Sequence, residues 1–139
     1  MILLDTSGLF AALVANQRAH KAAKAALEQA GPPFVLSPFV LAELDYFFAR
    51  EAGIAAELAF LAEVAAGAYE LAPFLADDTA AAAAVIERYR DLGIGLADAS
   101  IVVLAHRYDT DRVLTLDERH FRALRTRQGK PFALLPADA

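Results

Sequence analysis

The sequence of 139 residues contains no cysteine and no apolar run of membrane-spanning length. Without cysteine the chain has no disulfide framework and no thiolate metal ligand, which is compatible with a reducing cytosol. The apolar region from Ile54 to Ala76 is interrupted by Glu57, Glu63 and Glu70, so it is not a plain membrane helix. The N-terminus also lacks the basic segment of a signal peptide. We therefore expect a cytoplasmic protein that does not enter a membrane.

Positive charge is scarce as well, because 13 lysines and arginines stand against 18 aspartates and glutamates, a formal net charge of -5. This balance argues against a polyanionic partner, unless bound cations cancel some of the acids locally. The basic residues are nevertheless grouped, and no acid occurs between Arg119 and Ala137. That segment and a smaller basic cluster at residues 18–24 are either solvated surfaces or contacts for an anion.

Hydrophobic residues, by contrast, make up 58% of the chain. This share excludes a disordered chain, and the length suits one domain with its own core, which we assign to residues 1–139. The apolar content is high enough for an additional apolar interface.

Short apolar runs alternate with helical patterns along the chain. The runs predict strands at residues 2–4, 34–36, 69–71, 112–116 and 131–135. Helices are expected at about residues 9–15, 18–30, 38–52, 55–66, 79–90 and 96–108, with a short one around Phe121. This alternation predicts an α/β fold of three layers, in which a mainly parallel central sheet is flanked by helices.

Two of the predicted strands end at an acid. Ile2, Leu3 and Leu4 run directly into Asp5, and Ser7 is a candidate cap for the helix that follows. The strand at residues 112–116 ends in the same way at Asp117, with Thr115 inside the strand. In an open α/β sheet ligands bind at the carboxyl ends of the strands, so both acids are candidate site residues.

Two further acids occur near the starts of helices. Glu43 follows Val40 by three residues and precedes Phe47 by four, so we place it on the apolar face of its helix. Asp98 shares a face with Ile101 and with apolar residues further along its own helix. Because helix starts and strand ends lie at the same edge of a parallel sheet, all four acids are expected to meet there.

Four clustered carboxylates repel one another unless a cation neutralises them. Hard oxygen ligands of this kind suit Mg²⁺ or Mn²⁺, and such ions commonly act on phosphates. Each acid taken singly is also explained as a helix cap or a surface charge. The three histidines show no regular ligand spacing, although His120 is close to Asp117 in the sequence.

Four segments of the sequence resemble the motifs of the PIN domain, and specifically those of VapC-type toxin ribonucleases. They are Leu4-Asp5-Thr6-Ser7, Ala42-Glu43-Leu44, Leu96-Ala97-Asp98-Ala99, and Leu114-Thr115-Leu116-Asp117 followed by His120-Phe121. The resemblance extends over essentially the whole chain, in the family's order and spacing. It implies a parallel α/β sheet with an acidic pocket that binds Mg²⁺ or Mn²⁺ and cleaves the phosphodiester bonds of single-stranded RNA.

The resemblance also implies a role for each residue of the site. Asp5 and Asp98 would be the principal metal ligands, while Glu43 and Asp117 would act through water or position the attacking water. Neighbouring hydroxyl groups would hold the carboxylates, and they belong to Thr6, Ser7 and Thr115. A homodimer and a VapB antitoxin that covers the pocket are the implied partners. The candidate phosphate contacts for RNA are Arg119, Arg122, Arg125 and Arg127.

Two other classes of function compete with this interpretation. A haloacid-dehalogenase-like phosphatase also begins with a strand and an aspartate, but it needs a second aspartate where this chain has Ser7. A non-catalytic module, either a receiver-like switch or a PIN fold that only binds RNA or a partner, is the alternative from a different class. A receiver requires paired acids and a late lysine that the sequence does not clearly provide, and an inactive PIN fold usually lacks one of the acids.

Overall fold

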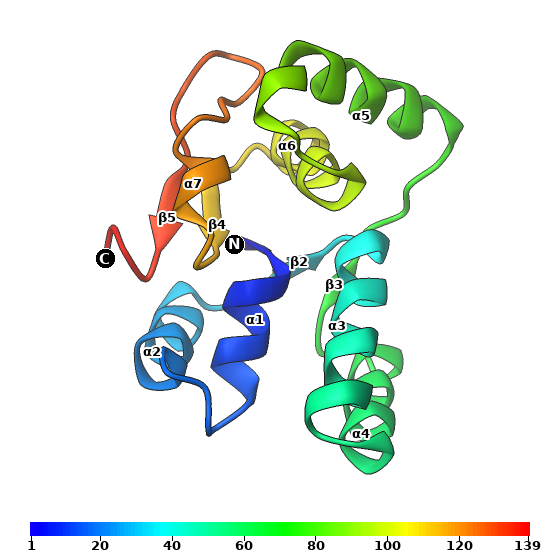
Figure 1. The fold of residues 1–139 in the computed structure, drawn as a ribbon, viewed down its shortest axis with the longest axis vertical. Helices are drawn as coiled ribbons and strands as arrows, with labels where there is room; N and C mark the ends of the chain where they lie inside the picture. Colours follow the sequence, from blue (N-terminus) through cyan, green and yellow to red (C-terminus); the bar gives the residue numbers. More distant parts are fainter.

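The central sheet has five strands that all run parallel, in the order β3-β2-β1-β4-β5. The computed structural model describes residues 1–139. Figure 1 shows the pairs α1–α2 and α5–α6 on opposite sides of the strands, with α3 and α4 packed against each other beside them. The strands are β1 (Ile2–Leu4), β2 (Phe34–Leu36), β3 (Glu70–Leu71), β4 (Arg112–Leu114) and β5 (Ala133–Leu135). The predicted three-layer α/β fold is confirmed.

The helices begin and end close to the predicted limits, and α6 matches its prediction at both ends. They are α1 (Thr6–Leu13), α2 (His20–Ala30), α3 (Pro38–Glu51), α4 (Ile54–Ala65), α5 (Ala76–Arg88), the 3-10 helix η1 (Arg90–Leu92), α6 (Leu96–Tyr108) and α7 (Glu118–Phe121). None of them combines the length and the apolar character needed to cross a bilayer.

The three residues of β1 are the centre of the core because they are covered on both faces. Ile2, Leu3 and Leu4 are 0–1% exposed, and the strand is paired with β2 on one side and β4 on the other. A run without polar residues is what a strand buried on both faces requires. The edge strand β3 is exposed and has only two residues, which limits its unpaired backbone.

A close approach between α1 and β4 fixes how the sheet edge is built. A Cβ atom added to Gly8 would lie 2.3 Å from the carbonyl oxygen of Leu114, which is far inside any normal contact. The absence of a side chain at Gly8 therefore lets the first turn of α1 rest on the end of β4. This contact brings Ser7, just before Gly8, to the residues that follow Leu114.

Several predicted boundaries were wrong by a few residues. Helix α1 begins at Thr6, so Ser7 is inside the helix and does not cap it. Strand β4 ends at Leu114, so Thr115 follows the strand rather than lying within it. In both cases the hydroxyl group bonds across the sheet edge instead of to its own element. Helix α2 begins at His20 rather than at Arg18.

Helix α3 shows why an apolar pattern can place an acid incorrectly. Its N-terminus is as predicted, because the Ser37 hydroxyl accepts a hydrogen bond from the Phe39 amide and Pro38 is the first helical residue. Its buried stripe, however, is Val40, Leu44 and Phe48. Glu43 lies at the margin of that stripe and is exposed, so its predicted place on the buried face is wrong.

Candidate active site

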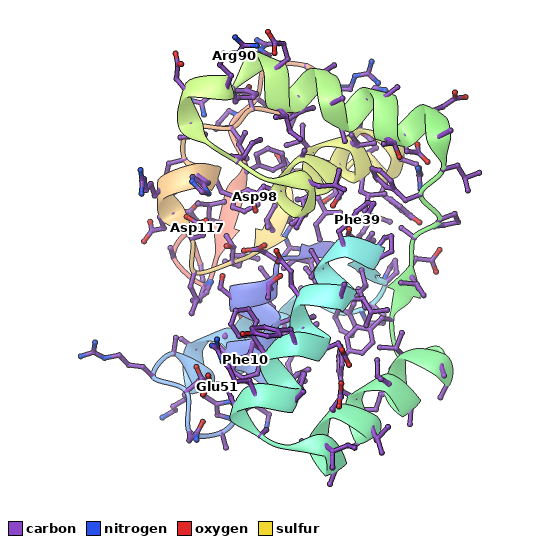
Figure 2. The ribbon with its side chains drawn as sticks, turned by 45° about the vertical axis from the view of Figure 1, so that its right-hand side comes forward. Phe10, Phe39, Glu51, Arg90, Asp98 and Asp117 are labelled. Carbon is purple, nitrogen blue, oxygen red and sulfur yellow. The ribbon has the colours of Figure 1, made fainter.

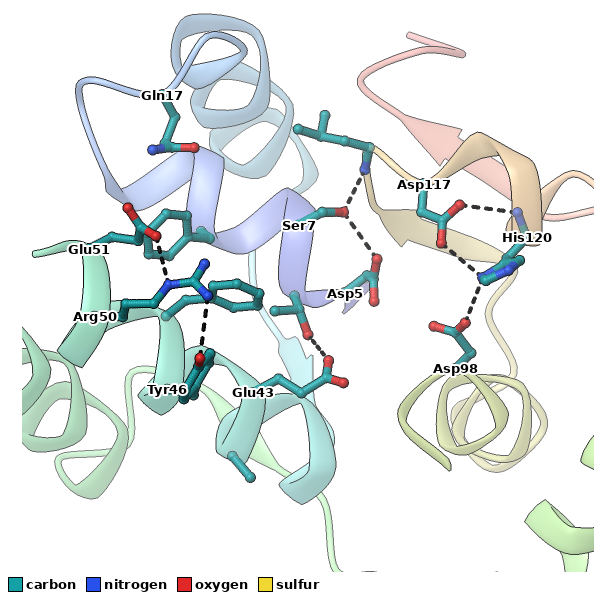
Figure 3. Close-up of a pocket in the computed structure, with 15 residues that line it drawn as sticks. Asp5, Ser7, Gln17, Glu43, Tyr46, Arg50, Glu51, Asp98, Asp117 and His120 are labelled. Atoms are coloured by element: carbon teal, nitrogen blue, oxygen red, sulfur yellow. Dashed lines mark hydrogen bonds and ion pairs between the residues drawn. The ribbon is translucent and has the colours of Figure 1, made fainter. Parts of the chain in front are cut away.

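A single pocket at the carboxyl edge of the sheet collects the acids that end strands and begin helices. Its volume is about 960 Å³, and Figure 3 shows the side chains that line it. They come from Asp5 and α1, the loop between α1 and α2, α3, α6, and the segment that follows β4 up to α7. The acids singled out in the sequence all line this pocket, and they are Asp5, Glu43, Asp98 and Asp117.

Asp5 is the most buried of these acids, with 5% of its surface exposed. Its backbone amide donates to the Leu114 carbonyl at 3.0 Å, which continues the pairing of β1 with β4. Its Oδ2 accepts hydrogen bonds from Thr115 Oγ1 at 2.7 Å and from Ser7 Oγ at 3.2 Å. Burial raises the pKa of Asp5 to about 6, although the Thr115 hydroxyl lowers it and the charge of Asp98 raises it further.

The same two hydroxyl groups also hold the segment that follows β4. Thr115 Oγ1 accepts from the Asp117 amide at 2.9 Å, and Ser7 Oγ accepts from the Leu116 amide at 3.0 Å. Each hydroxyl therefore donates towards Asp5 and accepts from a backbone group near Asp117. The structure thus places Ser7 and Thr115 where side chains that orient carboxylates are expected.

Glu43 reaches the pocket from α3 and is held by the remaining predicted hydroxyl. Thr6 Oγ1 donates to Glu43 Oε1 at 2.5 Å, although the two residues are 37 positions apart in the sequence. Glu43 is exposed, so water also reaches its carboxylate. This contact joins the first turn of α1 to α3 across the pocket.

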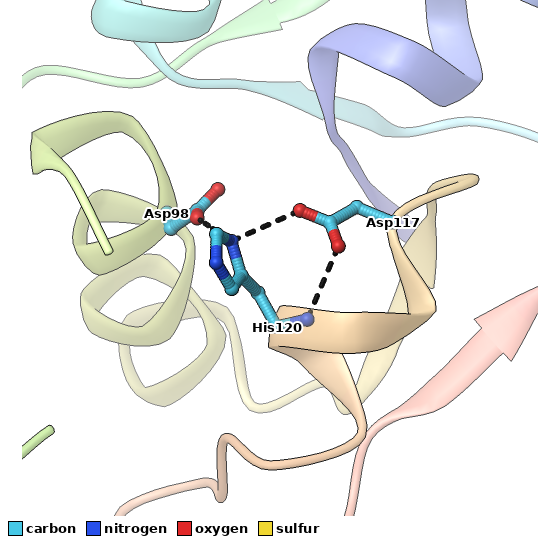
Figure 4. A group of neighbouring side chains, drawn as sticks. All are labelled: Asp98, Asp117 and His120. Atoms are coloured by element: carbon cyan, nitrogen blue, oxygen red, sulfur yellow. Dashed lines mark hydrogen bonds and ion pairs between the residues drawn. The ribbon is translucent and has the colours of Figure 1, made fainter. Parts of the chain in front are cut away.

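Asp98 and Asp117 face each other with a histidine between them (Figure 4). Asp98 lies in the first turn of α6, and Asp117 caps α7 by accepting from the His120 amide at 3.1 Å. His120 Nδ1 lies 3.1 Å from Asp98 Oδ2 and 3.0 Å from Asp117 Oδ2. Burial raises the pKa of Asp98, the nearby His120 lowers it, and the charge of Asp117 raises it.

His120 was missing from the residues assigned to the site from the sequence. Its position three residues after a capping aspartate was the available signal, because a residue at that offset lies over the helix start. Its ligand atoms and those of Asp98 and Asp117 all lie within 4.8 Å of one another. Two carboxylates and an imidazole at that separation, with Asp5 and Glu43 in the same pocket, fit a hard divalent cation.

The opposite end of the pocket is aromatic and carries its only arginine. Arg50 Nε pairs with Glu51 at 2.8 Å, and Arg50 Nη1 donates to the Tyr46 hydroxyl at 3.3 Å. The guanidinium carbon lies 5.1 Å from the ring centroids of both Tyr46 and Phe47. The sequence analysis assigned no role to these residues, because only the folded pocket connects them to the acids.

The arginines proposed as RNA contacts do not line this pocket. Arg122 forms ion pairs with Asp138 at 2.7 Å and Glu118 at 2.9 Å, which raise its pKa. Arg125 Nη1 donates to the carbonyl oxygens of Arg122 and Leu124. Arg119 and Arg127 are exposed. Their contact with RNA stays a prediction, but the guanidinium of Arg122 already has carboxylate partners.

Comparison with known proteins decides the family. The profile described as "PIN domain" matches residues 2–126 of the chain. The chain belongs to the PIN-domain family. Over 135 residues it is 45% identical to "Ribonuclease VapC26" of Mycobacterium tuberculosis, an alignment that covers 97% of this chain and all of that protein. The resemblance to VapC-type PIN domains noted in the sequence is therefore confirmed.

Two solved structures share the fold of this PIN domain. One is described as a crystal structure of Mycobacterium tuberculosis VapC20, a "Sarcin-Ricin loop cleaving toxin", with a TM-score of 0.77, 22% identity, and coverage of 84% of this chain and 90% of that one. The other is a toxin-antitoxin complex from Klebsiella pneumoniae, with a TM-score of 0.67, 22% identity, and coverage of 89% and 92%. At this identity the likeness concerns the fold alone.

Proposed function

We propose that this PIN domain is a Mg²⁺- or Mn²⁺-dependent endoribonuclease and the toxin of a VapBC toxin–antitoxin pair. The observation that carries the proposal is the convergence of Asp5, Glu43, Asp98 and Asp117 on one pocket. Its 45% identical relative is named a ribonuclease, which supports RNA as the substrate. One structural neighbour is described as a "Sarcin-Ricin loop cleaving toxin" and another as a toxin–antitoxin complex.

The residues that would hold the cation are Asp5 and Asp98, with Glu43 and Asp117 acting directly or through water. When bound, Mg²⁺ or Mn²⁺ supplies charge compensation for the phosphate and lowers the pKa of a coordinated water. The raised pKa values of Asp5 and Asp98 support this assignment, because Asp5 is buried, Asp98 is half-buried, and both lie near like charges that a cation would offset.

The remaining groups of the pocket position the acids. Thr115 and Ser7 fix the Asp5 carboxylate from one side, and Thr6 fixes Glu43. The His120 ring bridges Asp98 and Asp117 through Nδ1, which sets their separation. Since preorganised groups need not reorient during the reaction, this network suits hydrolysis of a phosphodiester by an activated water.

The partners proposed are a VapB-like antitoxin and a second copy of the chain. Large apolar side chains remain exposed on α4 and on the segment before α5, including Ile54 at 71%, Leu58 at 58% and Leu75 at 71%. Exposed apolar residues support protein interfaces in this protein. Light scattering of the purified chain tests the homodimer, and copurification with the product of the neighbouring reading frame tests the antitoxin.

The activity is tested by incubating a panel of RNAs with the protein, with and without Mn²⁺. We expect cleavage by the wild type that needs the metal and is lost in Asp98→Ala. Asp77→Ala is the matched control, because Asp77 also lies in the first turn of a helix but outside the pocket. If wild type and Asp98→Ala behave alike under every condition, the nuclease proposal fails.

Two alternative functions give different results in the same experiment. A non-catalytic PIN fold would bind RNA without cleaving it at any metal concentration. A phosphatase would hydrolyse small phosphate esters and leave RNA intact. The structure favours neither over the nuclease, because all four acids are present in the pocket and no lysine lines it.

A further inference from the structure

The end of the pocket opposite His120 is built from one face of α3. Four of its residues line the pocket from the same side of the helix. Counted from Glu43, they are Tyr46 three residues later, Phe47 four residues later and Arg50 seven residues later. Two helical turns, about 10 Å, separate Glu43 from Arg50. Figure 3 shows the resulting order, with Arg50, Tyr46 and Glu51 at one end, Asp98 and His120 at the other, and Glu43 between them.

Tyr46 and Arg50, which we call the Tyr46–Arg50 platform, present a flat and accessible surface. Tyr46 is 58% exposed, and the guanidinium carbon of Arg50 lies over its ring, 5.1 Å from the ring centroid. Arg50 uses Nε for Glu51 and Nη1 for Tyr46, while Nη2 has no partner within the chain. The platform therefore offers planar surface and an unused hydrogen-bond donor in one place.

A layer of packed aromatic rings supports the platform from below. Tyr46 packs edge-on against Phe47 at 5.7 Å between centroids, and Phe47 contacts Phe10 at 5.9 Å. Phe10 in turn contacts Phe48, and both belong to the core. The Tyr46 ring is thus mounted on a rigid surface, so a flat ligand can stack on it with little loss of side-chain freedom.

The charges of the pocket indicate what the platform binds. Asp5, Glu43, Asp98 and Asp117 lie towards the other end, and Arg50 is the only arginine or lysine that lines the pocket. Single-stranded RNA presents a phosphate and a planar base in every nucleotide. Its unpaired bases are recognised by stacking on aromatic rings or arginine planes, with arginine also available to the backbone.

We infer that the Tyr46–Arg50 platform is the subsite that stacks an unpaired base of the RNA, in a nucleotide flanking the bond that the acids cleave. This inference rests on the proposed ribonuclease activity and adds the position of a neighbouring nucleotide. It places the cationic contact for RNA at Arg50 inside the pocket, rather than on the basic segment that begins at Arg119. The base stacks on the Tyr46–Arg50 pair, and Arg50 Nη2 donates to a phosphate or base oxygen.

The test measures binding of fluorescently labelled oligouridylate and oligoadenylate by anisotropy, with Mg²⁺ present. All proteins carry Asp98→Asn, so that cleavage does not interfere with the binding measurement. We expect Tyr46→Ala to weaken binding about tenfold and Tyr46→Phe to retain it, because stacking needs the ring and not the hydroxyl. Arg50→Ala should weaken binding to a similar degree and also reduce its dependence on salt.

Arg90→Ala is the matched control for Arg50→Ala. Both arginines are exposed and paired with a neighbouring glutamate, Arg50 with Glu51 at 2.8 Å and Arg90 with Glu87 at 2.5 Å. Figure 2 shows Arg90 at the outer end of the molecule, far from Glu51. The affinity of Arg90→Ala for either oligonucleotide should equal that of the parent.

An abasic ribose-phosphate oligomer of the same length separates base stacking from other causes. With this probe Tyr46→Ala should bind as well as its parent, since there is no base to stack. The inference is overturned if Tyr46→Ala binds the normal oligonucleotides like the parent, or if it loses the same factor on the abasic oligomer. It is also overturned if the substitutions weaken only the binding of the antitoxin.

RNA cleavage is measured separately, with the same substitutions made in the wild-type chain without Asp98→Asn. This measurement distinguishes the failure of this inference from the failure of the proposed function. If Tyr46→Ala does not affect RNA cleavage at low substrate concentration, the nuclease proposal stands and the base-stacking subsite is rejected. If RNA binding depends on the base but no RNA is cleaved, the platform is supported as a binding site and the nuclease proposal is rejected. Circular dichroism melts of each variant confirm that the fold is retained, because Tyr46 lies outside the core.

Discussion

Strands β1 and β4 lie side by side, and each leads into a short segment with a hydroxyl residue and an aspartate. Asp5 is 5% exposed and accepts from two hydroxyl groups, whereas the Asp117 side chain is 33% exposed and faces His120. Similar sequence at two adjacent strand ends thus produces one deeply buried acid and one partly solvated acid in the same pocket. Burying a charged carboxylate costs stability, whereas a carboxylate that water reaches costs little.

The largest difference between the two acids is expected in catalysis. Asp5→Asn should lower kcat/KM for RNA on the order of 10³-fold, because a fixed and charged group at the reacting centre is lost. Asp117→Asn should lower it about 10–100-fold, as for a residue that acts through water or a neighbour. Steady-state cleavage under saturating Mn²⁺ measures both values. An equal loss of kcat/KM in Asp5→Asn and Asp117→Asn would show that the difference in burial between the two acids has no effect on catalysis.

The second prediction concerns Gly8, which allows the two strand ends to share hydroxyl groups. Gly8→Ala should destabilise the fold by about 3 kcal/mol or more, because the new methyl group overlaps the Leu114 carbonyl. Gly95→Ala is the control, since nothing lies within 4 Å of its added Cβ atom and its φ is negative. Urea denaturation measures both. A similar small loss for the two variants would contradict the close contact.

The third prediction uses the pKa of Asp5, about 6 in the folded chain against an ordinary value of 3.8. Between these values the folded state binds more protons than the unfolded state, so this group adds stability as pH falls through 6. In chelator at pH 8, Asp5→Asn should therefore be more stable than wild type by about 3 kcal/mol.

That advantage of Asp5→Asn should shrink as pH falls below 6 and vanish only below about 3.8, where the carboxyl is protonated in the unfolded chain as well as in the folded one. Urea melts of both proteins at a series of pH values give the difference directly. A constant difference between Asp5→Asn and wild type at every pH would contradict the effect of burial.

The smallest effect is expected from the hydroxyl group that serves both acids. Thr115→Val removes the donor to Asp5 and the acceptor for the Asp117 amide, and should cost about 1–2 kcal/mol. Thr115→Ser keeps the hydroxyl and should retain most of the stability. The pKa of Asp5 should rise further in Thr115→Val, which carboxyl NMR titration in chelator detects. No rise would mean that this hydroxyl does not stabilise the charged form.

Much of this site could be predicted because topology is encoded locally. The run of Ile2, Leu3 and Leu4 requires burial on both faces, and strands separated by helices require a parallel sheet. Parallel strands and the helices after them then bring Asp5 and Asp98 to one edge without any knowledge of packing. The same reasoning placed the limits of α6 correctly.

The details that failed depend on contacts between distant residues. The periodicity of α3 allowed two stripes, and tertiary packing selected the wholly apolar one through Leu44, which left Glu43 exposed. Ser7 resembles a helix cap until α1 is placed against β4, because only then are Thr115 and the Leu116 amide within its reach. The contact of His120 with Asp98 needed the meeting of α6 with α7, which the local signal at Asp117 does not report.

Helix α7 has only four residues, yet its movements should be slow, because Phe121 is fully buried and packs edge-on against Phe132. Asp117 and His120 lie just before Phe121 in the chain. Moving them far from Asp98 therefore requires the Phe121 ring to leave the core. Such an opening exposes apolar surface and costs a free energy near that of global unfolding. Hydrogen exchange at the Leu124 amide, which donates to the His120 carbonyl, should accordingly be as slow as in β1. Helix α7, although short, is therefore expected to stay in place at the pocket wall over minutes to hours.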